Sequence, residues 1–359
     1  MKKKVKLGLY GCGNRTRALL DSLFLDEEYD VVAAHDIRGE STEAACRKYG
    51  GKACATSEEL VAHPDVEAFM ISLDPFAHPA AFHETLEAGK PIFVEKPIAM
   101  SARDAYDMMV AAESRNIPAQ VGFMRRYRPK HVAARAYMAE NDPGTLFSVN
   151  CRWFHAGETE MINMLTNHPD NFRLKVSQIP FHCCHALDVM MLYGGAVKSV
   201  SAVGRKVIER PYPSPDEVIA TLEFENGCMG SFHYCSVSYA GCIAYRVHTG
   251  NYTLSFEAGN SLTISHRPPL RSLREDGSGD CRPLYHGCIA PETRQFSVKT
   301  VDHLIMLDFL NSVRTGAPMS APIRAGYRVA ELAEAIERSW QEKQTVQLPL
   351  TFDPEVNAD

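Results

Sequence analysis

A glycine-rich segment near the N-terminus is the first part of the sequence whose residue types suggest chemistry. Gly11, Gly13, Asn14 and Arg15 directly follow a short apolar stretch, Val5–Tyr10. Glycines at the end of a strand allow a tight turn, and they let backbone N–H groups approach a pyrophosphate, which the positive end of a following helix also favours. The segment therefore predicts a dinucleotide-binding loop, with a plain strand-end turn as the alternative.

An acidic residue stands where ribose recognition requires one. Asp36 ends the second apolar stretch, at the distance from the glycines that is typical of dinucleotide-binding units. A carboxylate there accepts hydrogen bonds from ribose hydroxyls and repels a 2′-phosphate, which favours NAD over NADP. Arg38 would instead suit NADP, and a turn at the end of the strand is the structural alternative for Asp36.

Two further groups of polar residues follow apolar stretches. Ser72, Pro75 and His78 lie near the end of the fourth stretch, and Glu95 and Lys96 end the fifth. The carboxyl ends of parallel strands meet at one edge of a sheet, where ligands bind, so we expect all five residues beside a cofactor. Opposite charges are costly to bury without partners, so the Glu95–Lys96 pair also indicates a reactive site, with a surface ion pair as the alternative.

Two imidazoles lie close together later in the chain. His182 and His185 are three residues apart, so on a helix they share one face, and Asp188 follows one turn later, where it can orient His185. With Cys183 or Cys184, such a set could bind a metal ion. We expect no metal site, because no second pair of ligands at metal-binding spacing occurs elsewhere in the sequence.

The elements that must position these residues follow from the periodicity. Short apolar stretches alternate with amphipathic helical segments, which predicts a doubly wound parallel sheet, a Rossmann domain, over residues 1–123. The predicted strands are Val5–Tyr10, Asp30–His35, Lys52–Cys54, Ala68–Leu73, Ile92–Glu95 and Ala119–Gly122. The predicted helices are Arg17–Leu25, Thr42–Tyr49, Ser57–Ala62, Pro79–Ala88 and Ala102–Arg115.

After about residue 123 the rhythm changes, and residues 124–359 are predicted to form an α+β domain with a large, open, mainly antiparallel sheet. The predicted strands are Glu217–Phe224, Met229–Val237, Ile243–His248 and Thr253–Glu257, in two hairpins. The predicted helices are Lys130–Glu140, Val301–Arg314 and Ala325–Gln341. The stretch from Arg267 to Arg294 has no clear period and is predicted to be a long loop.

Composition excludes several classes of function. The chain has 359 residues, with 38 Lys and Arg against 44 Asp and Glu, so no basic excess is available for binding nucleic acid. No apolar run is long enough for a membrane helix. The eleven cysteines form no CxxC pair, which is typical of reduced thiols in a cytoplasmic protein.

Taken together and in order, these motifs resemble those of the Gfo/Idh/MocA family, oxidoreductases similar to glucose–fructose oxidoreductase and inositol dehydrogenase. The motifs are Gly11-Cys12-Gly13-Asn14-Arg15, Asp36, Glu95-Lys96-Pro97, Val121-Gly122-Phe123-x-Arg125-Arg126-Tyr127 and His185-x-x-Asp188. The resemblance implies NAD(P) in a Rossmann domain, an open C-terminal sheet often used in homo-oligomers, and oxidation or reduction of sugar-like hydroxyls. It also implies that Lys96 is the active-site lysine and His185 the catalytic histidine.

The loops 125–127, 152–155 and 163–171 carry polar groups that could bind the hydroxyls of a sugar. The residues expected to contact substrate are Arg125, Tyr127, Trp153, His182 and Asp188. One departure stands out, because family members often have Asp four residues before the histidine, where this chain has Phe181. Three interpretations stay open: a dehydrogenase with a variant proton relay, acting for example at C3 of a glucoside; a non-catalytic dinucleotide- or sugar-binding regulator; or a glycosidase that uses transiently reduced NAD.

Overall fold

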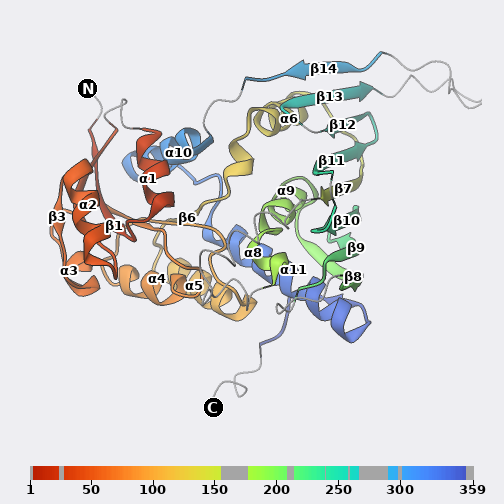
Figure 1. Cartoon of the computed structure of the whole chain (residues 1–359). Coiled ribbons are helices and arrows are strands. Elements are labelled where there is room, and N and C mark those ends of the chain that lie inside the picture. Colours follow the sequence, from red (N-terminus) through yellow and green to blue (C-terminus); the bar gives the residue numbers. More distant parts are fainter. Residues whose placement is uncertain are drawn as a thin grey trace, which may run out of the picture.

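The N-terminal part of the chain builds a six-stranded parallel sheet. The computed structural model describes residues 3–23, 28–154, 177–207, 214–238, 240–257, 259–266, 290–297 and 301–352. In this sheet the strand order is β3-β2-β1-β4-β5-β6, and every neighbouring pair is parallel (Figure 1). Its strands are β1 (Val5–Tyr10), β2 (Tyr29–His35), β3 (Lys52–Ala53), β4 (Ala68–Ile71), β5 (Ile92–Val94) and β6 (Ala119–Val121).

Helices on both faces bury this sheet, which explains why its central strands are continuously apolar. All residues of β4 and β5 are buried. The crossover helices are α1 (Asn14–Asp21), α2 (Gly39–Tyr49), α3 (Ser57–Val61), α4 (His78–Leu86) and α5 (Ala102–Ser114). The predicted doubly wound sheet is confirmed, with element ends that differ by a few residues.

The C-terminal part contains a nine-stranded sheet in the order β14-β13-β12-β11-β7-β10-β9-β8-β15. Only β7 and β10 pair in parallel, so the predicted mainly antiparallel sheet is confirmed. Its strands are β7 (Leu146–Phe154), β8 (Val197–Arg205), β9 (Glu217–Phe224), β10 (Met229–Cys235), β11 (Cys242–Thr249), β12 (Tyr252–Phe256), β13 (Ser261–His266), β14 (Glu292–Gln295) and β15 (Val346–Gln347).

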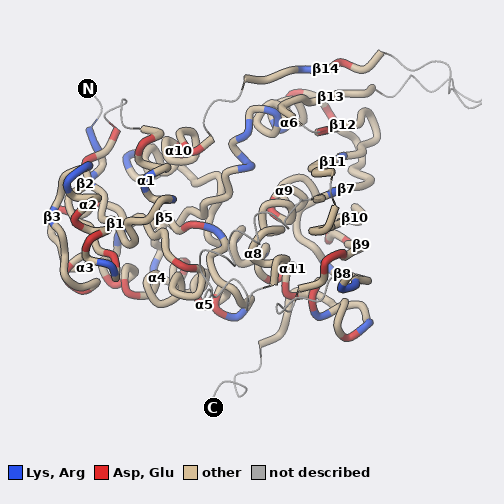
Figure 2. The backbone as a smooth tube through the Cα atoms, viewed as in Figure 1, with Lys and Arg blue, Asp and Glu red and all other residues tan. Residues whose placement is uncertain are grey.

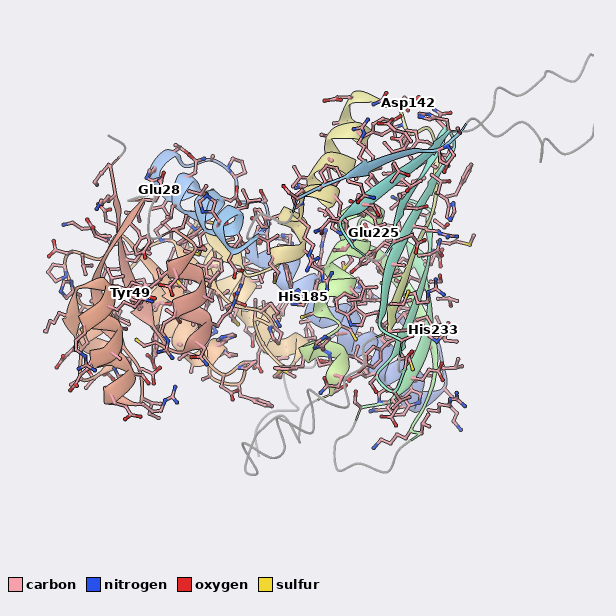
Figure 3. The ribbon with its side chains drawn as sticks, turned by 45° about the horizontal axis from the view of Figure 1, so that its top comes forward. Glu28, Tyr49, Asp142, His185, Glu225 and His233 are labelled. Atoms are coloured by element: carbon pink, nitrogen blue, oxygen red, sulfur yellow. The ribbon has the colours of Figure 1, made fainter. Side chains whose placement is uncertain are left out.

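Helices cover one face of this second sheet, the face towards the first domain (Figures 1 and 3). They include α6 (Pro129–Glu140), α8 (Gln178–Phe181), α9 (Cys184–Gly194) and α11 (Ile323–Glu342), and the 3₁₀ helix η2 (Met124–Tyr127) leads into α6. The strands therefore alternate between buried and exposed side chains, as in β9. Among the described residues, no helix is long and apolar enough to cross a membrane.

Two predictions about the second half of the chain are corrected. The predicted long loop is shorter, because Glu292–Gln295 forms the edge strand β14 on β13; residues 267–289 lie outside the described residues. Helix α10 (Val301–Thr315) forms as predicted, but it packs against the first sheet rather than the second. There Phe309 meets Phe93 of β5, with ring centroids 5.7 Å apart.

Candidate active site

The glycine loop after β1 has the geometry of an anion-binding turn. Gly11 has φ of 97°, and a Cβ there would overlap the carbonyl oxygen of Ser72, so only glycine fits. Gly13 precedes α1 without any side-chain cap, and no atom lies within 4 Å of where its Cβ would be. The free N–H groups at the start of α1 are thus open to a ligand, which fits the pyrophosphate of a dinucleotide.

Asp36 lies at the end of β2, as predicted, and is bonded to the glycine loop. Its Oδ2 accepts the backbone N–H of Cys12 at 2.9 Å, and its Oδ1 accepts the N–H of Arg38 at 2.9 Å. The next side chain, Ile37, is 94% exposed. An acceptor for ribose hydroxyls and an exposed apolar side chain therefore stand together, and sequence analysis missed the second of them.

His78 helps to hold the turn that carries Lys96. Its Nδ1–H donates to the carbonyl oxygen of Pro97 at 2.8 Å, and its Nε2 accepts the N–H of Leu73 at 3.2 Å. Burial lowers the pKa of His78 to about 4, so the imidazole is neutral at physiological pH. Both ring nitrogens are used within the protein, so His78 supports the site, while Ser72 and the buried Pro75 line the neighbouring loop.

Glu95 is buried and paired, as the cost of burying a charge requires. Its Oε1 accepts a hydrogen bond from Nε of Arg15 at 2.7 Å, and its Oε2 accepts the N–H of Lys96 at 2.9 Å. Arg15 also binds Asp302 of α10 at 2.9 Å. Sequence analysis missed Asp302, since nothing in the pattern links it to a residue nearly three hundred positions earlier. Glu95 and Arg15 therefore fix the backbone from which Lys96 projects.

Lys96 and His185 lie in the same neighbourhood, between the two sheets. The Nζ of Lys96 is 5.7 Å from the ring centroid of Phe181, on the segment that leads to His185 at the start of α9 (Figure 3). Burial, followed by the charges of Lys96 and Arg125, holds the pKa of His185 well below its ordinary value. The imidazole is therefore neutral near pH 7, and among the described residues its buried Nδ1 has no hydrogen-bond partner.

The indole ring of Trp153, on β7, packs against the imidazole ring of His185. The two rings stack with centroids 6.5 Å apart and planes 22° apart, and the guanidinium of Arg125 lies 4.3 Å from the indole ring. His182 approaches the same indole edge-on at 5.9 Å. The structure thus brings together four of the predicted residues, Arg125, Trp153, His182 and His185.

The structure places two other predicted substrate contacts elsewhere. Asp188 is fully buried and binds Arg126, with Nε donating to both carboxylate oxygens at 2.9 and 3.0 Å. The expectation that Asp188 orients His185 is therefore wrong, because the carboxylate is taken up by Arg126. The hydroxyl of Tyr127 donates to Asp308 at 2.6 Å and is also buried. The candidate loop 163–171 and residue 155 lie outside the described residues.

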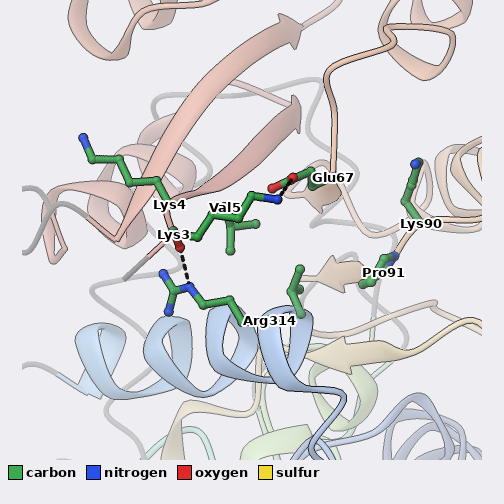
Figure 4. Close-up of a pocket in the computed structure, with 8 residues that line it drawn as sticks. Lys3, Lys4, Val5, Glu67, Lys90, Pro91 and Arg314 are labelled. Atoms are coloured by element: carbon green, nitrogen blue, oxygen red, sulfur yellow. Dashed lines mark hydrogen bonds and ion pairs between the residues drawn. The ribbon is translucent and has the colours of Figure 1, made fainter. Parts of the chain in front are cut away.

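A pocket of about 390 Å³ opens at the other end of the first sheet, beside the amino ends of β1 and β5 (Figure 4). Three of its cations have partners, and among them Lys4 binds Asp30 at 3.3 Å. Lys3 binds Glu67 at 2.5 Å, and Arg314 donates to the carbonyl oxygen of Lys3 at 2.8 Å. This pocket lies at the edge opposite the glycine loop, so it is not part of the candidate active site.

Comparison with known proteins agrees with this geometry. Residues 5–123 match the model of an oxidoreductase family with an NAD-binding Rossmann fold, and residues 180–348 match that family's C-terminal α/β domain. An inositol 2-dehydrogenase from Gluconacetobacter diazotrophicus is 36% identical over 321 residues, 86% of each chain. A levoglucosan dehydrogenase from Pseudarthrobacter phenanthrenivorans is 22% identical over 340 residues, 85% of this chain and 86% of the other.

Solved structures show the same fold. A levoglucosan dehydrogenase in complex with NADH and L-sorbose superposes with a TM-score of 0.81 at 18% identity, covering 98% of this chain and all of the other. A UDP-N-acetylglucosamine 3-dehydrogenase from Acidithiobacillus ferrooxidans gives a TM-score of 0.76 at 18% identity, over 95% of this chain and 99% of the other.

Proposed function

The chain belongs to the Gfo/Idh/MocA oxidoreductase family, and on this premise we propose that it transfers a hydride between a ring hydroxyl of a sugar or glycoside and NAD. The observation that carries the proposal is the meeting of a lysine and a neutral histidine between the two sheets. Both groups are suited to moving the hydroxyl proton while the carbon loses its hydride.

The residues that would hold the cofactor come from the first sheet. The backbone N–H groups around Gly13 and Asn14 would face the pyrophosphate, and Asp36 would accept the ribose hydroxyls, which favours NAD over NADP. Ile37 supplies an apolar surface beside that carboxylate. When bound, NAD supplies an acceptor for the hydride, and every proton is handled by side chains of this chain.

His185 is the proposed base. Its neutral imidazole accepts the hydroxyl proton of the substrate as the C–O bond gains double-bond character. Lys96 donates a hydrogen bond to the same oxygen and so stabilises the negative charge that develops on it. In the reverse direction the imidazolium returns the proton to the carbonyl oxygen. Phe181 gives the site an apolar wall, which would suit a glucoside with an apolar aglycone that is oxidised at C3.

Phe181 stands where family members often have Asp, so a carboxylate introduced there should change the pH dependence of the reaction. In a Phe181→Asp variant, a negative charge beside Lys96 and His185 favours the imidazolium and raises the pKa of His185. Because only the neutral imidazole accepts a proton, the acid limb of kcat/KM moves to higher pH, by about one unit. Phe181→Asn, which is similar in size but uncharged, is the control, and equal acid limbs in the two variants would contradict the proposed base.

The proposed activity is tested with purified protein, NAD and a panel of myo-inositol, levoglucosan, methyl glucosides and aryl glucosides. We expect NADH to form with at least one member, as measured by nicotinamide absorbance. Bound cofactor that never changes redox state would support the regulator, and release of aglycone without net NADH would support the glycosidase. Neither alternative is favoured, since the named relatives are sugar dehydrogenases.

We also propose that the protein is a cytoplasmic homo-oligomer that associates through the outer face of the second sheet. No described helix covers this face (Figure 3). Val203 of β8 and Ile219 of β9 pair directly and are exposed, and Met229 at the start of β10 is exposed as well. A Val203→Glu, Met229→Glu variant is expected to shift the mass in light scattering to that of a monomer. The described cysteines are all free, which suits a reducing compartment.

A further inference from the structure

We propose that the substrate of this site carries an anionic group, a carboxylate or a phosphate, and that Arg125 and Arg128 bind it. The inference rests on the proposed function and names the class of sugar that the site would take. It is carried by the arrangement of charged side chains where η2 leads into α6.

Basic residues gather on this segment, and the tube in Figure 2 is blue where the chain enters α6. Arg125 lies against the ring of Trp153, which in turn stacks on His185. The guanidinium of Arg125 and the imidazole of the proposed base thus contact the same indole ring. A substrate whose hydroxyl reaches His185 would hold its other substituents within reach of this segment.

Three nearby cations in the described part of the chain already have partners. Arg126 binds Asp188, and Arg15 binds Glu95 and Asp302. Lys130 donates to the carbonyl oxygens of Glu257 and Gly259 at 3.2 and 2.9 Å. The carboxylate of Glu257 binds Arg246, and that of Asp308 accepts the hydroxyl of Tyr127, so these carboxylates have partners other than Arg125 and Arg128.

Arg125 and Arg128 have no such partner in the part of the chain that the structure describes, whereas Arg135, whose buried Nε also lacks an acceptor there, at least donates to the carbonyl oxygen of Arg126 at 3.2 Å. In the described residues, neither forms an ion pair with a carboxylate, and the buried Nε of Arg128 has no acceptor. Two more buried donors near Arg125 lack an oxygen or nitrogen partner among the described residues: Nε1 of Trp153, and the hydroxyl of Tyr245, which lies beside the thiol of Cys151. A guanidinium that has no carboxylate partner among the described residues favours a ligand with an oxyanion.

The uncompensated charge affects the surrounding groups. Burial, followed by the charges of Arg128 and Arg125, lowers the pKa of Lys130 to about 8. Burial and Arg125 also lower the pKa of Arg128 itself. A neutral polyol would leave this positive potential in place, whereas an oxyanion would neutralise it and accept bidentate hydrogen bonds from a guanidinium.

The cofactor is a less suitable source of this anion. The pyrophosphate would lie at the start of α1, where Arg15 is already held by Glu95 and Asp302. Arg125 instead packs on Trp153, which belongs to the second sheet, on the side of His185. The anionic group is therefore assigned to the substrate.

The first test measures binding and needs no turnover. Inorganic phosphate and acetate are titrated by calorimetry into the wild type with NADH present, at an ionic strength kept constant with chloride. We expect saturable binding of at least one anion, about tenfold weaker in Arg128→Gln and partly restored in Arg128→Lys. Arg115→Gln, which removes a surface arginine paired with Glu87, is the matched control and should bind as the wild type does. Preference for phosphate or for acetate decides between the two anionic groups.

The second test compares each neutral sugar that is oxidised with its uronate and its 6-phosphate. We expect the kcat/KM ratio of acid to neutral sugar to exceed about ten in the wild type and to fall about tenfold in Arg128→Gln. Binding of neither anion by the wild type, or equal affinities and ratios in wild type and Arg128→Gln, would overturn the inference. Anion binding that depends on Arg128, without turnover of any sugar, would keep the inference and refute the proposed dehydrogenase.

Discussion

Replacing Lys96 with methionine is expected to lower kcat/KM for the sugar by about a thousandfold, within the range usual for loss of a group that stabilises developing charge. Methionine keeps much of the length and apolar volume of the lysine, and Glu95 and Arg15 still fix the backbone at this position. Affinity for NADH, measured by fluorescence titration, should therefore change little. The expected loss lies in kcat rather than in cofactor binding.

His185→Asn is expected to cause a loss of similar size and to remove the acid limb of the pH profile, because the group that titrates there is gone. Lys90→Met, which removes an exposed lysine of the pocket at the opposite edge, is the matched control and should leave turnover intact. Turnover close to wild type in both Lys96→Met and His185→Asn would show that the site assignment is wrong.

The largest expected effect on stability comes from Asp188. Asp188→Ala leaves the guanidinium of Arg126 buried without its counter-ion and should lower the free energy of unfolding by about 3–5 kcal/mol. Urea denaturation followed by circular dichroism measures the change. The double variant Arg126→Met, Asp188→Leu removes both charges and should recover most of the lost stability, since apolar side chains of similar volume tolerate burial.

An exposed ion pair provides the comparison. Glu113→Ala breaks the pair between Arg324 and Glu113 on the surface and should cost less than about 1 kcal/mol. If Asp188→Ala were as mild as this control and abolished activity alone, Asp188 would act in catalysis and its structural role would be refuted. The pair of variants therefore separates a buried structural carboxylate from a catalytic one.

Local patterns predicted the first sheet well, because its strands are apolar runs that end in glycine or polar residues. They missed strands whose residues are mixed or polar. Strand β8 interrupts its valines with serine and glycine, and β14 consists of polar side chains on the edge of the sheet. Such strands are defined by their neighbours, since pairing and packing determine their conformation more than composition does.

The candidate site shows the same division between local and tertiary information. The glycine loop, Asp36 and the Glu95–Lys96 pair could be predicted, since each follows a strand. The arginines of the segment 125–128 look alike in sequence, yet the side chain of one packs on Trp153, that of another binds Asp188, and that of the third forms no hydrogen bond or ion pair among the described residues. Only the fold assigns these different environments, because each partner comes from a distant element.

Helix α10 follows the second sheet in sequence but packs against the first sheet. We therefore expect the two halves of the chain to unfold as one cooperative unit. Ile305 and Phe309 complete the apolar core around Leu7 and Phe93, so a fragment that stops at residue 123 would expose that core to water. Asp302 of the same helix would also be lost as a partner of Arg15. The isolated N-terminal segment should therefore aggregate, and a nucleotide-binding module can be obtained from this protein only if α10 is attached to it.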